Sequence, residues 1–110
     1  MLVKDLTEKY GFEISAGGSS LNNEIKKAYI GDLLSWVMGR APEGSAWVTI
    51  QGHINVIAVA ELINAACIIV CENASFTPDT ISKADSEGIP LLKTKLTAYE
   101  VAKIFVAENV

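Results

Sequence analysis

Apolar runs alternate with helical patterns along the middle of the chain, and turn residues separate them. In the segment 45–71, an apolar run, a turn at Gly52, a largely apolar helical pattern and a second apolar run follow one another. The second run, Ala65–Cys71, has no polar interruption, which is typical of a strand at the centre of a parallel sheet. This segment predicts a strand–helix–strand unit.

The same alternation extends over the rest of the chain. Helix ends are indicated by Asp32 and Thr77 as N-caps, by Pro78 at a first helical position and by a Thr97–Glu100 capping box. The pattern predicts strands at 12–15, 25–30, 45–50, 65–71 and 89–93, and helices at 2–10, 33–40, 53–64, 78–87 and 98–108.

Repeated strand–helix units imply parallel strands joined by crossover helices. We therefore predict the α/β class: a three-layer α/β/α fold with a small, mostly parallel sheet and crossover helices on both faces. Residues 1–110 are expected to form a single domain. Within it, residues 1–24 form a lead-in helix, strand and polar loop, and residues 25–110 form the main α/β unit.

Composition excludes several classes of partner. The net charge is −4, the isoelectric point is near 4.9, and Arg40 is the sole arginine, which argues against a nucleic-acid partner. No apolar run reaches the roughly 18 residues of a membrane-spanning helix, and the charged start is unlike a signal peptide. We expect a cytoplasmic protein that binds neither nucleic acid nor membranes.

The two cysteines, Cys67 and Cys71, lie four residues apart on one predicted strand, so their side chains share a face. Their Cα atoms would be about 13 Å apart, which is too far for a disulfide. We predict two buried free thiols. The single histidine, His53, is not part of a cysteine-spaced motif, so we expect no metal site and no cofactor.

The helical pattern 53–64 has an apolar arc of roughly 200°, about twice the stripe that packing on one sheet requires. Either a neighbouring helix or another subunit must cover the remainder. Because two-fold dimers are the commonest oligomers, we expect a homodimer. Trp36 lies beside the predicted core stripe Leu33, Leu34, Val37 and Met38, where it either anchors an interface or lies against its own sheet. The candidate interface residues are Trp36, Val56, Ile57 and Ile63.

Polar residues follow the predicted strands at the edge where crossover helices begin. The candidate ligand-binding residues are Gly31, Asp32, Ser35, Gly52, His53, Asn55, Glu72, Asn73, Thr94 and Thr97. Free N–H groups at helix starts favour a small anionic or nucleotide-like ligand there. Asp32 and Glu72 oppose an anion, and Lys93 and Lys95 are the basic residues near these turns. Asp32, Thr77 and Thr97 also have a purely structural role as caps, and the helical pattern turns Asn55 inward.

His53 is the residue whose charge changes near neutral pH. Catalysis would require Asp32, Ser35 or Glu72 within about 3 Å of it. The segment Gly17–Ser20 lacks the lysine and spacing of a nucleotide-binding loop. We expect no catalytic residue and no enzyme activity.

Four segments resemble the DRTGG domain: Tyr29–Ser35, Val48–Asn55, Ala66–Cys71 and Gly88–Leu92. The resemblance extends from about Ile25 to the C-terminus, and it includes a distant similarity to the N-terminal domain of HPr kinase/phosphorylase. It implies a three-layer α/β/α fold and an accessory, regulatory and often dimer-forming role without catalysis.

The chain departs from the motif that names this family. It has Gly52-His53-Ile54 where the family has Gly-Asp-Arg, and Cys71-Glu72-Asn73 where the family has Thr-Gly-Gly. Ligand contacts of the Asp-Arg pair therefore cannot be transferred, and the chain resembles a stand-alone subgroup. Three hypotheses remain: a non-catalytic, homodimeric regulatory module that acts through a small ligand or a partner protein, a protein-interaction subunit with no small ligand, and a small enzyme centred on His53.

Overall fold

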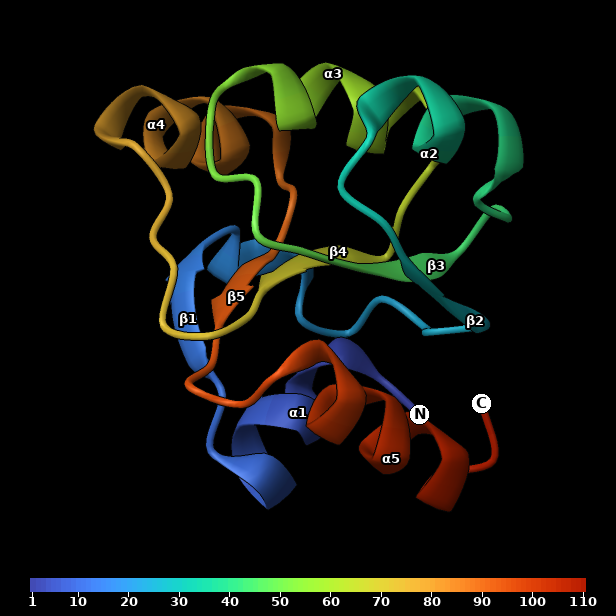
Figure 1. Ribbon diagram of the computed structural model, residues 1–110. Helices are drawn as coiled ribbons and strands as arrows, with labels where there is room; N and C mark the ends of the chain where they lie inside the picture. The colour runs from blue at the N-terminus through green and yellow to red at the C-terminus, as the bar shows by residue number, and fades with distance from the viewer.

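The computed structural model describes residues 1–110 and contains one five-stranded sheet between two layers of helices (Figure 1). The strands are β1 (Glu13–Ala16), β2 (Lys27–Ile30), β3 (Ser45–Thr49), β4 (Cys67–Val70) and β5 (Leu91–Lys93). The helices are α1 (Val3–Tyr10), the short 3₁₀ helix η1 (Gly18–Ser20), α2 (Leu34–Arg40), α3 (Asn55–Leu62), α4 (Pro78–Glu87) and α5 (Ala98–Ala107). The predicted α/β class with a mostly parallel sheet is confirmed.

The strand order is β1-β5-β4-β3-β2, and β2 to β5 are parallel while β1 pairs antiparallel with β5. Each crossover steps to the next strand in the same direction, so crossovers of one handedness place α2, α3 and α4 on the same face (Figure 1). The expectation that crossover helices cover both faces is therefore wrong in this detail. The terminal helices α1 and α5 cover the other face, which completes the three layers.

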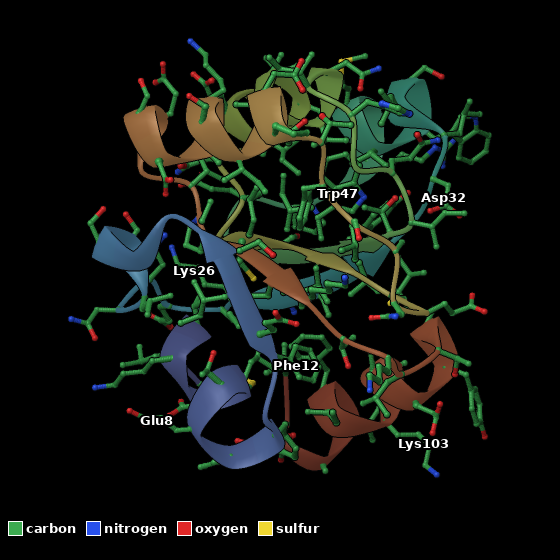
Figure 2. The ribbon with its side chains drawn as sticks, turned by 90° about the vertical axis from the view of Figure 1, so that its left-hand side faces the viewer. Glu8, Phe12, Lys26, Asp32, Trp47 and Lys103 are labelled. Atoms are coloured by element: carbon green, nitrogen blue, oxygen red, sulfur yellow. The ribbon has the colours of Figure 1, made fainter.

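Each face of the sheet has its own apolar core. Trp47 is fully buried on the side of the crossover helices, whereas Phe12 lies on the side of α1 and α5 (Figure 2). Cys67, Ile69 and Cys71 all belong to the core on the second side, and both thiols are free. The prediction of two buried thiols on one face is confirmed.

Helix α3 lies between α2 and α4, which cover its broad apolar arc (Figure 1). Val56, Ile57 and Ile63 are buried in the core of the chain itself. Their proposed place in a subunit interface is therefore wrong, because neighbouring helices provide the second surface that the arc requires. Trp36 is 53% exposed, so it alone among the candidate interface residues is accessible.

Helix α2 is shorter than predicted and has a narrower buried face. It begins at Leu34, and its contacts with the core come from Leu34 and Val37. Leu33 and Met38 were predicted in the core stripe but are 61% and 44% exposed. Leu33 precedes the helix as its N-cap in an extended conformation, so it is not part of the helix face that packs on the sheet.

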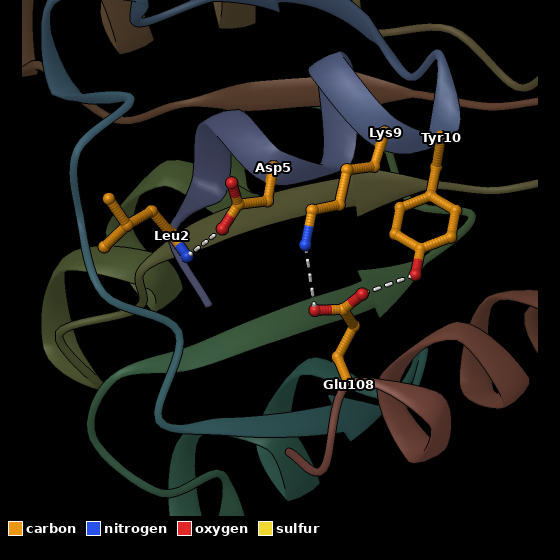
Figure 3. A network of polar contacts seen from close by, with 5 residues as sticks. All are labelled: Leu2, Asp5, Lys9, Tyr10 and Glu108. Carbon is orange, nitrogen blue, oxygen red and sulfur yellow. Dashed lines mark hydrogen bonds and ion pairs between the residues drawn. The ribbon is translucent and has the colours of Figure 1, made fainter.

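Polar contacts join the ends of α1 and α5 (Figure 3). The Tyr10 hydroxyl donates to Glu108 Oε2 at 2.6 Å, and Lys9 Nζ lies 3.6 Å from Glu108 Oε1. The hydrogen bond to Glu108 raises the pKa of Tyr10. At the other end of α1, the backbone N–H of Leu2 donates to Asp5 Oδ2 at 2.8 Å. The contacts of Glu108 with Tyr10 and Lys9 tie the first and last helices together beneath the sheet.

Candidate functional site

The carboxyl ends of the four parallel strands meet at one edge of the sheet, as expected for this topology. Figure 2 shows Lys26 and Asp32 at opposite ends of β2, and the candidate edge is the one with Asp32. The residues at this edge fall into two groups, one at the ends of β2 and β3 and the other at the ends of β4 and β5.

The first group, which we name the Asp32 cluster, consists of Asp32, Thr49, Ile50 and Gln51. The Asp32 carboxylate accepts from the Thr49 hydroxyl at 2.7 Å and from the Ile50 N–H at 3.0 Å. The Gln51 amide donates to the Asp32 carbonyl at 3.1 Å. Asp32 therefore does not cap α2, whose N-cap is Leu33 without a side-chain hydrogen bond. Its carboxylate joins two adjacent loops instead.

Gly52 lies where the two groups meet. A Cβ atom at this position would be 2.0 Å from the Ser75 carbonyl oxygen, so no other residue fits without a shift of the backbone. The Gly52 carbonyl accepts from the Thr77 N–H and the Thr80 hydroxyl, both at 3.0 Å. Gly52 thus has a steric role at the start of α4.

His53 and Asn55 are exposed at the start of α3. The prediction that Asn55 turns inward is wrong, because Val56 and Ile57 are the residues of the first turn that enter the core and Asn55 lies on the exposed side of the helix. The Asp79 carboxylate accepts from Thr77, which lowers its pKa, and the charge of His53 acts in the same direction.

The turn after β4 has an unusual backbone conformation. Glu72 and Asn73 have φ values of 55° and 59°, in the left-handed region that favours glycine. Their N–H groups donate to the Leu96 and Thr94 carbonyls at 2.8 and 2.9 Å. Glycine adopts this conformation without strain, whereas Glu72 and Asn73 each hold a Cβ in it.

The second group surrounds a concave pocket of about 260 Å³, which we name the Lys93–Lys95 pocket. It is lined by Tyr10, Gly11, Glu13, Asn73, Lys93, Thr94, Lys95 and Leu96. Lys93 Nζ donates to Ser75 Oγ at 3.1 Å. The ion pairs of the chain are Lys9 with Glu108 and Lys83 with Glu87, so neither pocket lysine is neutralised by a carboxylate within 4.0 Å.

The structure brings together only part of the predicted site. Asn73 and Thr94 both line the Lys93–Lys95 pocket. Asp32 belongs to the separate Asp32 cluster, and Gly31 precedes it in the chain. Ser35 lies on α2 in an open groove with Trp36, and Thr97 belongs to the predicted capping box of α5, which is confirmed.

The residues of these groups that the sequence analysis missed are Tyr10, Gly11, Glu13, Thr49, Ile50, Gln51 and Leu96. Thr49 could have been found from the sequence, because it is a polar residue in the otherwise apolar run from Ala46 to Ile50. Its hydroxyl is buried and therefore needs a partner, which Asp32 supplies.

The fold favours the neutral form of both cysteine thiols. Burial raises the pKa of the Cys67 thiol and raises that of Cys71 to about 11, with further contributions from the charges of Glu72 and Asp32. No group of three His, Cys, Asp or Glu side chains is arranged to hold a metal ion. None of the helices has the length and apolar character needed to cross a bilayer.

No protein-family model matches the sequence, and no curated protein sequence matches it. Among solved structures, the chain is similar to the CBS and DRTGG domains of the regulatory region of Clostridium perfringens pyrophosphatase, complexed with the activator diadenosine tetraphosphate. The TM-score is 0.74 at 11% identity, and the match covers 96% of this chain and 46% of the other. The chain thus spans just under half of that regulatory region. At the level of fold, the resemblance to the DRTGG domain is confirmed.

Proposed function

We propose that the chain is a non-catalytic regulatory module that binds a small anionic or nucleotide-like ligand at the carboxyl edge of its sheet. The observation that carries this proposal is the fold similarity, over nearly the whole chain, to a regulatory region that was solved with a bound nucleotide activator. The open polar pocket at the end of β5 supports it, because a ligand needs a concave surface with groups left free to bind.

The geometry around His53 favours regulation over catalysis. An enzyme centred on this imidazole would need a hydroxyl or carboxylate at hydrogen-bond distance. Asp32 is engaged with Thr49, and Ser35 lies in the groove on α2. The His53 side chain forms no ion pair with a carboxylate within 4.0 Å, and the Asp79 carboxylate accepts from Thr77.

A direct test is calorimetric titration of the chain with diadenosine tetraphosphate, ATP, inorganic pyrophosphate and adenosine. The proposal expects saturable binding of at least one of these ligands, without their hydrolysis over the same period. If all four give no heat of binding and do not raise the melting temperature, the proposal of an anionic or nucleotide-like ligand is wrong.

We further propose that the module forms a homodimer through the outer surface of α2. Leu33, Trp36 and Met38 are all at least 44% exposed there, and Arg40 stacks on the Trp36 ring at 3.8 Å. Half-exposed tryptophan and arginine side chains are the residue types that dominate protein interfaces. This surface also supports the alternative function, a protein-interaction subunit with no small ligand.

Light scattering of the wild-type chain and of Trp36→Glu tests the dimer. We expect a dimeric mass for the wild type and a monomeric mass for the variant. Tyr99→Glu is the matched control, because Tyr99 is 75% exposed on α5, which lies on the opposite side of the sheet. A wild-type monomer would reject the homodimer and direct attention to a different partner protein.

A further inference from the structure

We propose that the Lys93–Lys95 pocket binds the phosphate chain of the ligand, while the rest of the ligand lies outside it. This inference rests on the proposed function and assigns its site. The ligand class is a phosphorylated metabolite with at least two linked phosphates, such as a nucleoside polyphosphate or a diphosphate ester.

The distribution of charges along the carboxyl edge favours the Lys93–Lys95 pocket as the phosphate site. The Asp32 cluster contributes a carboxylate, and its donors are already used within the chain. Lys93 and Lys95 are two residues apart at the end of β5, and neither pairs with a carboxylate. Two unpaired ammonium groups in a concave site attract a multiply charged anion, and they donate the charge-assisted hydrogen bonds that phosphate oxygens accept.

The walls of the pocket are held in place before any ligand arrives. Tyr10 is fixed by its hydrogen bond to Glu108 (Figure 3), and the Asn73 backbone is fixed by its bond to the Thr94 carbonyl. Lys93 is oriented by Ser75. Since little further ordering is needed on binding, most of the interaction free energy is available for affinity.

The size of the pocket limits what enters it. Pockets that enclose a whole drug-sized ligand occupy about 300–1,000 Å³. At about 260 Å³, this pocket has room for a short phosphate chain but not for a complete nucleotide. We therefore expect pyrophosphate alone to compete for the site, and adenosine alone not to bind there.

The Glu13 carboxylate repels an anion in the same pocket. Removing its charge should therefore change the ligand affinity in the direction opposite to removal of the lysine charges. Glu13 lies directly across from Lys93 in the antiparallel β1–β5 pair and also lines the pocket. It forms no ion pair with either lysine, so its charge remains to repel a phosphate. Removing this charge without changing the size of the side chain should strengthen binding.

The experiment is calorimetric titration with pyrophosphate and with diadenosine tetraphosphate. It compares the wild type, the double variant Lys93→Gln/Lys95→Gln, the single variant Glu13→Gln and the control Lys27→Gln. Lys27 is exposed on the distant edge strand β2, so its variant removes a positive charge away from the pocket. All substitutions are at exposed or partly exposed side chains, and melting curves verify that each variant is folded.

We expect the double variant to lose at least tenfold in affinity, because two charge-assisted hydrogen bonds disappear. Glu13→Gln should gain about threefold, and Lys27→Gln should match the wild type. Binding that is unchanged in the double variant would overturn the pocket assignment while leaving the proposed function intact. Adenosine that binds as tightly as the phosphate ligands would also overturn it. Failure of the wild type to bind any of the ligands would instead reject the proposed function.

Discussion

The two halves of the carboxyl edge are made from the same kinds of strand end, yet they differ in how far their polar groups are satisfied. In the Asp32 cluster, the carboxylate, a buried hydroxyl and an amide bond to one another and join the β2 and β3 loops. In the Lys93–Lys95 pocket, two ammonium groups remain without carboxylate partners. A polar cluster whose groups bind one another stabilises the fold, whereas ammonium groups without a carboxylate partner are available to an anionic ligand.

The largest expected effect is at the boundary between the two halves. Gly52→Ala places a Cβ 2.0 Å from the Ser75 carbonyl oxygen, so we expect a loss of about 3 kcal/mol in the free energy of unfolding. Urea denaturation measures this loss. Gly39→Ala is the control, because a Cβ there meets nothing within 4 Å and should stabilise α2 by about 0.5–1 kcal/mol. Equal stability of the two variants would contradict the steric role of Gly52.

Loss of the Asp32 carboxylate should lower the stability of the fold and leave ligand binding in the Lys93–Lys95 pocket unchanged. Asp32→Ala leaves the buried Thr49 hydroxyl without its acceptor, so we expect a loss of about 2 kcal/mol in unfolding free energy. Phosphate binding should not weaken in this variant. Asp32→Asn retains an acceptor oxygen and should lose less stability. If Asp32→Ala abolished binding in a protein that is still folded, the two halves would have to act as one site.

A glycine substitution in the turn after β4 should raise the free energy of unfolding, whereas the substitutions of Gly52 and Asp32 lower it. Glu72→Gly removes the side-chain strain at a φ of 55°, so we expect a gain of about 1 kcal/mol in unfolding free energy. Glu72→Ala is the control for the lost charge, because it retains a Cβ and therefore the strain. Thermal denaturation of both variants distinguishes the two effects. A less stable glycine variant would show that the Glu72 side chain makes a stabilising contribution that outweighs the strain.

The last effect depends on pH and concerns Cys71, whose thiol is influenced by charges from both halves. Burial, Glu72 and Asp32 raise its pKa from 9.0 to about 11, so the fold favours the neutral thiol. This contribution to stability is complete below the ordinary thiol pKa and is lost as the pH rises from about 9 to 11. Urea denaturation across this range should show a shallower loss for Cys71→Ala than for the wild type. Parallel curves would contradict the raised pKa.

Much of the fold could be predicted from the sequence because its signals are local. The apolar run at 65–71 specified β4, Pro78 marked the start of α4, and Thr97 with Glu100 marked the start of α5. These signals depend on side-chain periodicity and on backbone donors within one turn, and neither requires knowledge of distant contacts.

What covers α3 was decided only by tertiary structure. Its apolar arc showed that a second surface was needed, but the neighbours α2 and α4 supply it, and Ile57 is buried in the chain as a result. The same holds for Asp32. Its position before a helix predicted an N-cap, but its carboxylate accepts a hydrogen bond from Thr49 on another strand. A pattern along one element shows which face is apolar or polar, but the partner of that face depends on strand order.

Local patterns along the chain were enough to predict the fold class, the buried thiols and the edge at which polar groups gather. Only the tertiary structure divided that edge into a satisfied cluster and an open pocket. The physical reason is that a polar group is satisfied only when a hydrogen-bond or ion-pair partner lies beside it. Asp32 and Thr49 are 17 residues apart, and Glu13 faces Lys93 because β1 returns to pair with β5. Such pairs form when the sheet assembles, so no local pattern records them.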